Sequence, residues 1–171
     1  MRANADRVEK AVHYVIARTD PAELGSVKLN KILWYSDLEH YRRYGQSLTG
    51  LSEYTRMPQG PMSKDISQAL RRLSAAGAIH VRKVPVFDYT RHEHVALKEP
   101  NVEDFTPNQI DILNIMIDVI RKMTAEGVSE VTHDALWKEL QNDEPMPVRA
   151  GAVIRRPATE ADIDWARQLS A

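Results

Sequence analysis

The hydrophobic positions of the chain are most informative between residues 26 and 44, where they predict a helix that is apolar on more than one side. Small or apolar residues form one stripe at 29, 32, 33 and 36 and a second at 27, 34, 38 and 41. A surface helix needs only one such stripe, so this helix is predicted to pack between neighbours on two sides. The strip on its remaining side is predicted to be exposed. It consists of Lys28, Lys31, Tyr35 and Glu39.

Similar patterns predict further elements in the first half of the chain. Residues 5–18 place their apolar residues on one helical face, and residues 51–57 have the composition of a short strand. A Gly-Pro turn then leads into another helix, which begins at Pro61 or Ser63 and is closed by Gly77.

Alternation of apolar and polar residues over 78–86 and 89–97 predicts a β-hairpin, with Asp88 as a turn residue between the strands. His92 and His94 share one face of the second strand, a spacing that can hold a metal ion. A third ligand is not evident in the sequence, however. We therefore expect no metal and no cofactor.

The clearest helix start in the chain is Thr106-Pro107-Asn108-Gln109, which combines a capping threonine, an early proline and a glutamine three residues after the cap. The body is predicted over 110–125, with Gly127 ending it. Nine Ile, Leu, Met or Val residues fall between 110 and 123, too many for one solvent-facing amphipathic helix. This helix is therefore either central to the core or presents a second apolar face to a partner.

The C-terminal part is predicted to hold a short helix over 132–141, a loop over 142–147 and a last helix capped by Thr159. The predicted fold class is mainly α with a small antiparallel β element. We expect one domain over 1–171, in which 142–171 form a C-terminal loop and helix extension.

The composition, 43% hydrophobic and 27% charged, is that of an ordinary globular chain. There is no cysteine, no apolar run of membrane-spanning length, and no apolar segment near Met1 of the kind that secretion signals carry. We therefore expect a cytoplasmic protein. Phosphate-binding glycine loops and the Gly-x-Ser-x-Gly motif are absent from the sequence, so an enzyme is not expected.

Charge is unevenly distributed along the chain. Residues 56–98 hold eight Lys or Arg against three Asp or Glu, whereas residues 99–144 hold three against eleven. One interpretation is that the two sections solvate the fold or attract each other. The other is that two surfaces of opposite charge steer different partners.

Two binding surfaces follow from the predicted elements. In the first, Lys28, Lys31 and Tyr35 lie beside Gly60 and Pro61 and form a contact site for a protein partner. The alternative is a winged-helix-like transcriptional regulator, whose third helix and hairpin contact DNA phosphates. Its contact residues are Arg71, Arg72, Arg82, Lys83 and Arg91. The sequence pI near 6.6 is low for a dedicated DNA-binding domain.

Two motifs in this chain resemble a known family. KLNKILWYSDLEHYRRYGQSLTG, followed by MPQGPMSKDI, is similar to the Panacea domain of SocA-like antitoxins, and a weaker likeness continues through Gly77 to Trp137. Where Tyr-Gly-Pro is more usual, this chain has Gln59-Gly60-Pro61. The resemblance implies an antitoxin that binds a cognate protein toxin and holds it inactive without turnover. It also implies an association with prophage for some relatives, and a second role as an adaptor that delivers the toxin to a bacterial protease.

Overall fold

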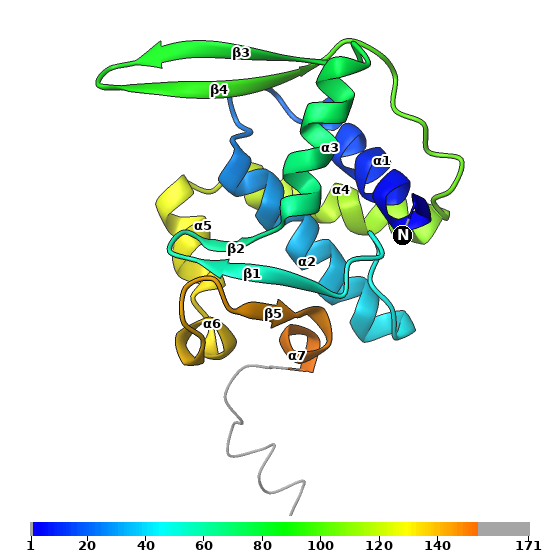
Figure 1. Cartoon of the computed structure of the whole chain (residues 1–171), viewed down its shortest axis with the longest axis vertical. Helices are drawn as coiled ribbons and strands as arrows, with labels where there is room; N and C mark the ends of the chain where they lie inside the picture. The colour runs from blue at the N-terminus through cyan, green and yellow to red at the C-terminus, as the bar shows by residue number, and fades with distance from the viewer. Residues whose placement is uncertain (1, 154–171) are drawn as a thin grey trace, which may run out of the picture.

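The computed structural model describes residues 2–153, and four longer helices form the body of the molecule (Figure 1). They are α1 (Arg2–Arg18), α2 (Ser26–Tyr44), α3 (Lys64–Ala75) and α4 (Pro107–Arg121). Helix α2 is central, in contact with both α1 and α4. Leu29 and Leu33 from one of its apolar stripes, and Trp34 and Leu38 from the other, are buried. The predicted two-sided packing of this helix is confirmed, as is the mainly helical fold class with antiparallel β elements.

A three-stranded antiparallel sheet covers one side of α2 (Figure 1). Its strands β1 (Glu53–Met57), β2 (Gly60–Met62) and β5 (Pro145–Pro147) have the order β2-β1-β5. Of the two predicted starts for the next helix, Pro61 is wrong, because it pairs with Arg56 inside β2, and Ser63 is confirmed as the residue that caps the helix. An edge strand tolerates proline, which has no N–H to donate. Helix α3 begins after Ser63, whose hydroxyl accepts a hydrogen bond from the backbone N–H of Asp65.

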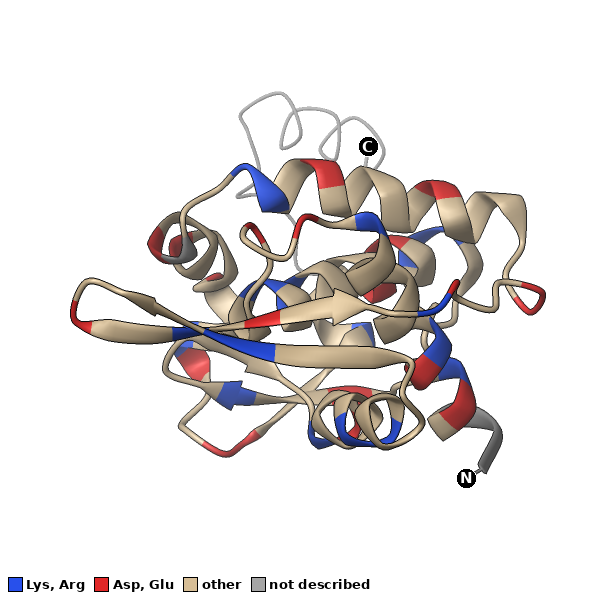
Figure 2. Ribbon diagram, turned by 90° about the horizontal axis from the view of Figure 1, so that it is seen from above, with Lys and Arg blue, Asp and Glu red and all other residues tan. Residues whose placement is uncertain are grey.

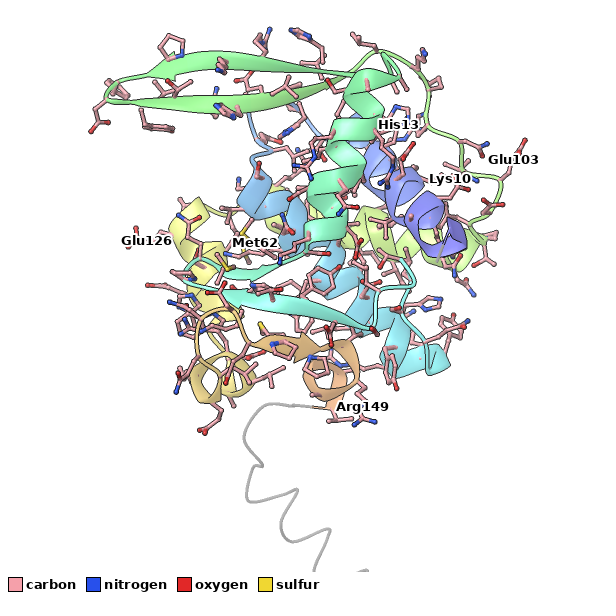
Figure 3. The ribbon with its side chains drawn as sticks, viewed as in Figure 1. Lys10, His13, Met62, Glu103, Glu126 and Arg149 are labelled. Carbon is pink, nitrogen blue, oxygen red and sulfur yellow. The ribbon has the colours of Figure 1, made fainter. Side chains whose placement is uncertain are left out.

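The predicted hairpin is confirmed as strands β3 (Ile79–Val86) and β4 (Tyr89–Ala96), paired in register from Ile79 opposite Ala96 to Val86 opposite Tyr89. It extends away from the helical body (Figure 1), and side chains project from both of its faces (Figure 3). Phe87 at the tip is fully exposed and has a φ of 51°.

Helix α4 begins with the predicted capping box, in which Thr106 and Gln109 bond each other's backbone N–H groups. It ends at Arg121, earlier than predicted, and α5 (Ala125–Thr132) follows. The prediction that Gly127 ends a helix is wrong. Its N–H donates to the Thr124 hydroxyl at 3.0 Å, so this glycine lies in the first turn of a new helix.

Helix α6 (Ala135–Glu139) is shorter than the helix predicted over 132–141, because Thr132 belongs to α5 and Asp134 caps α6. The segment predicted as a loop contains β5, and α7 (Val148–Val153) follows and packs on α2. The predicted helix capped by Thr159 lies outside the described residues. Within residues 2–153, none of the helices combines the length and apolar character needed to cross a membrane.

Candidate partner-binding surface

Lys31, predicted to lie in an exposed strip, is instead buried, with 1% of its surface exposed. Its Nζ donates a hydrogen bond to Ser129 Oγ on α5 at 2.8 Å, and no ion pair links it to a carboxylate within residues 2–153. Burial without a counter-charge lowers the pKa of Lys31 to about 8. The prediction of an exposed strip is therefore wrong at its centre, because α5 packs over this side of α2.

The two other strip residues predicted to contact a partner, Lys28 and Tyr35, are half-buried. Both form hydrogen bonds to the helices that pack over this side of α2. The Lys28 ammonium donates to the carbonyl of Arg121 at 2.9 Å, and burial lowers the pKa of Lys28. The Tyr35 hydroxyl donates to the carbonyl of Val131 at 3.1 Å, and burial raises the pKa of Tyr35 above its ordinary range. Both side chains thus bond backbone oxygens of α4 and α5 and leave only part of their surface to solvent.

Gly60 lies beside Lys31, as predicted, but both residues are buried rather than on the surface. A Cβ at Gly60 would lie 2.7 Å from Lys31 Cε and 2.7 Å from Thr132 Oγ1, and the φ of 115° also favours glycine. Ser129 Oγ bonds the carbonyl of Gln59 at 3.2 Å and joins the β1–β2 loop to α5. Pro61 is buried beside this junction. These residues hold α2, the sheet and α5 together.

An apolar surface lies where α5 and the end of α4 meet over Tyr35. A cavity of about 140 Å³ opens there. It is lined by Tyr35, Met116, Val119, Ile120, Met123, Val128 and Val131. Ile115 lies one helical turn before Val119 and is 51% exposed; Val119 is 48% exposed and Val131 53%. These eight residues are called the α4–α5 apolar surface below. The excess of apolar residues in α4 was the sequence signal for a second apolar face.

The segment that carries most of this surface, residues 115–134, holds four Asp or Glu residues against two Lys or Arg. Asp118 on α4, and Glu126 and Glu130 on α5, are exposed. Figure 2 marks the acidic positions of the ribbon in red, and Glu126 points away from the body (Figure 3). After the larger effect of burial, the charge of Asp134 helps to raise the pKa of the Tyr35 phenol, and the charge of Arg42 acts in the opposite direction. Arg121 is engaged with Glu23 at 3.2 Å and with Asp118 at 3.1 Å. The α4–α5 part of the border therefore carries a net charge of −2 over residues 115–134.

Asp37 anchors the loop that connects α2 to β1. Its carboxylate accepts hydrogen bonds from the Thr49 N–H and hydroxyl, both at 2.7 Å, and from the Tyr54 hydroxyl at 2.8 Å. All three residues are buried. Burial raises the pKa of Asp37 to about 6, although these hydrogen bonds act in the opposite direction. We assign this group a structural role, because no part of it reaches the surface.

The basic residues of the DNA-binding alternative do not form one free positive surface. Arg72 pairs with Glu9 of α1 at 2.6 Å. Arg82 and Arg91 both pair with Glu93, at 2.5 and 2.6 Å, and cover its carboxylate, whose pKa they lower. Arg71 and Lys83 are exposed. Three of the five cations thus have carboxylate partners, which reduces the charge available to phosphates.

Among the described residues, no group of three or more His, Cys, Asp or Glu side chains is arranged to hold a metal ion. His94 is buried, while His92 faces solvent.

The comparison with protein families identifies the family of this chain. A model of the family described as "Antitoxin SocA-like, Panacea domain" matches residues 29–138. No curated protein and no solved structure matches the chain. The matched residues run from the first turn of α2 to α6 and include most of the α2 strip and the whole α4–α5 apolar surface. Because the match covers more than half of the chain, this protein belongs to the SocA-like antitoxin family of Panacea domains.

Proposed function

We propose that this chain is an antitoxin that holds a cognate protein toxin inactive by direct, stoichiometric binding, without turnover or cofactor. The observation that carries the proposal is the family match over residues 29–138. An exposed apolar surface inside the matched region supports it, since contiguous apolar surface of this kind is characteristic of interaction sites. The absence of cysteine is in keeping with a complex that forms in the cytoplasm.

The five residues predicted to contact the partner divide into two groups in this proposal. Tyr35 reaches the α4–α5 apolar surface with its ring and contributes to binding directly. Lys31, Gly60 and Pro61 are buried and support that surface from beneath, and Lys28 fixes the end of α4 through the Arg121 carbonyl. A specific interface of ordinary size buries about 800 Å² on each partner, so the contact must extend beyond the cavity itself.

Co-expression with the product of the neighbouring gene tests the proposal. We expect the neighbour alone to arrest growth, the pair to grow, and the two proteins to co-purify in equal amounts at moderate salt. An interface with an apolar centre should survive that salt concentration, whereas a complex driven by phosphate contacts loses affinity steeply. A neighbour that is not toxic, or a toxic neighbour that is neither rescued nor bound, would contradict the proposal.

A role as proteolytic adaptor extends the same proposal and is measured in the same cells. If the chain delivers its toxin to a protease, the half-life of the toxin should fall when the chain is present. An unchanged or longer half-life, together with rescue of growth, would leave occlusion as the whole mechanism.

A further inference from the structure

Helix α4 has two apolar faces, and only one of them is buried against the rest of the fold. Its inner face is buried through Ile112, Leu113 and Ile117. Ile115 and Val119 are about half exposed on the other side and continue into the cavity over Tyr35. Isolated exposed apolar side chains are common, but a continuous row that ends in a cavity is a feature of binding surfaces.

The cavity has the size and chemistry of a socket for one bulky apolar side chain. An engineered apolar cavity of roughly 150 Å³ is large enough to bind benzene, and this one measures about 140 Å³. The Tyr35 hydroxyl is already bonded to the Val131 carbonyl, so Tyr35 offers its ring rather than a polar group. Met116 and Met123 line the wall, and their flexible thioether side chains can adjust to the shape of an inserted group.

The border of the cavity specifies the charge of its ligand. Asp118, Glu126 and Glu130 are exposed on the two helices that line it, and Arg121 at the end of α4 is engaged with Glu23 and Asp118. Lys122 is an exposed cation at the end of α4. Complementary charge accelerates encounter and excludes wrong partners, so an acidic border selects a positively charged segment.

From these observations we propose that the α4–α5 apolar surface receives a bulky apolar side chain, aromatic or leucine, from a segment of the toxin that is flanked by Lys or Arg. The inference rests on the proposed antitoxin function for the identity of the partner, but the surface chemistry stands independently of it. The segment inserts its side chain over Tyr35 between Val119 and Val131, and its cations meet the carboxylates of α4 and α5.

Other occupants fit this surface less well. A symmetric dimer through the same face would bring two acidic borders together, and like charges facing each other oppose association. Nucleic acid and anionic membranes are repelled by the same carboxylates. The observations therefore favour a basic protein segment.

The first arm of the test uses the purified complex of the chain and its toxin. Val119→Glu and Val131→Glu, each placing a charge in the cavity wall, should weaken toxin binding at least tenfold by calorimetry. Leu97→Glu is the matched control, because Leu97 is 59% exposed and lies outside the cavity lining. The affinity of this variant for the toxin should stay within twofold of that of the parent. Glu130→Lys should slow association, whereas Glu99→Lys, at an exposed site after β4, should not.

The second arm needs no toxin and uses three short peptides: acetyl-KKFKK-amide, acetyl-EEFEE-amide and acetyl-KKGKK-amide. In titrations followed by NMR, the first should shift amide resonances of α4 and α5 most strongly, and Val119→Glu should abolish those shifts. Equal shifts with all three peptides, or shifts confined to other elements, would overturn the inference.

The two arms separate failure of the surface from failure of the proposed function. If a toxin is bound and neutralised normally by Val119→Glu and Val131→Glu, this surface is not the docking site, although the antitoxin function stands. If no toxin is found but the KKFKK peptide binds at the cavity, the antitoxin proposal fails and the surface chemistry holds.

Discussion

Helices α2 and α4 both carry apolar residues on more than one side, yet their environments differ. Helix α2 is enclosed, with α1, α4, α5, α7 and the sheet against it, so that even Lys31 and Asp37 are buried. Helix α4 buries one face and leaves Ile115 and Val119 half exposed. Burial depends on which neighbouring element covers a residue as well as on the residue type. Helix α5 covers Lys31 of α2 but leaves Val119 of α4 half exposed.

The largest effect is expected from placing a negative charge in the enclosed helix. Lys31→Glu removes the bond to Ser129 and leaves a carboxylate in a site with 1% exposure. An uncompensated charge at a buried site costs about 3–5 kcal/mol. Urea unfolding should report a loss of that size, and Arg43→Glu, on the exposed last turn of α2, is the control. A loss below about 1 kcal/mol would mean that this side of α2 opens readily to water.

Gly60→Ala tests the same junction from the sheet side. The added methyl group would lie 2.7 Å from both Lys31 Cε and Thr132 Oγ1, at a φ of 115° that alanine rarely adopts. Overpacking costs about 1–3 kcal/mol, so a loss near 2–3 kcal/mol is expected once the backbone strain is included.

Gly25→Ala is the matched control for that substitution. No atom lies within 4 Å of the site of a Cβ at Gly25, and its φ is −110°. Gly25 is the N-cap of α2, where alanine is a poorer cap than glycine, so the loss in the free energy of unfolding should stay below about 1 kcal/mol. Equal effects of the two substitutions would mean that Gly60 is not the point of close contact between the sheet and α2.

The sequence predicts the bounds of α2 and the start of α4 better than it predicts what covers each helix. Periodicity placed the bounds of α2, and the Thr106–Gln109 capping box marked the start of α4, since both signals are local. The packing of α5 over Lys31 is not a local feature, because it depends on a new helix that Thr124 caps, whereas Gly127 by itself predicts the end of a helix. The α4–α5 cavity was missed for the same reason, although the apolar excess of α4 indicated a second face.

Asp37 gives a pH dependence that belongs to the enclosed helix. The pKa of Asp37 is raised from 3.8 to about 6 in the folded chain, so its contribution to stability is largest below pH 3.8 and is lost as the pH rises through about 6. Between pH 5 and pH 7.5 this loss amounts to about 1.4 kcal/mol. Other groups titrate in the same range, so the effect is measured as a difference between two proteins.

Asp37→Asn supplies that difference, because an amide does not ionise. The free energy of unfolding of the parent, followed by urea at both pH values, should fall relative to that of the variant as the pH is raised. Parallel pH profiles for the two proteins would show that Asp37 keeps the same pKa when the chain unfolds.

The smallest effect is expected on α4, where Val119→Glu introduces the same charge as Lys31→Glu. Val119 is 48% exposed, so a carboxylate there can remain in water, and the helix tolerates glutamate well. The free energy of unfolding should change by no more than about 0.5 kcal/mol. A loss above about 2 kcal/mol would mean that the cavity wall is part of the core, and it would remove the distinction between the enclosed and the open helix. A stable Val119→Glu protein makes any loss of toxin binding a property of the surface, because folding is then excluded as its cause.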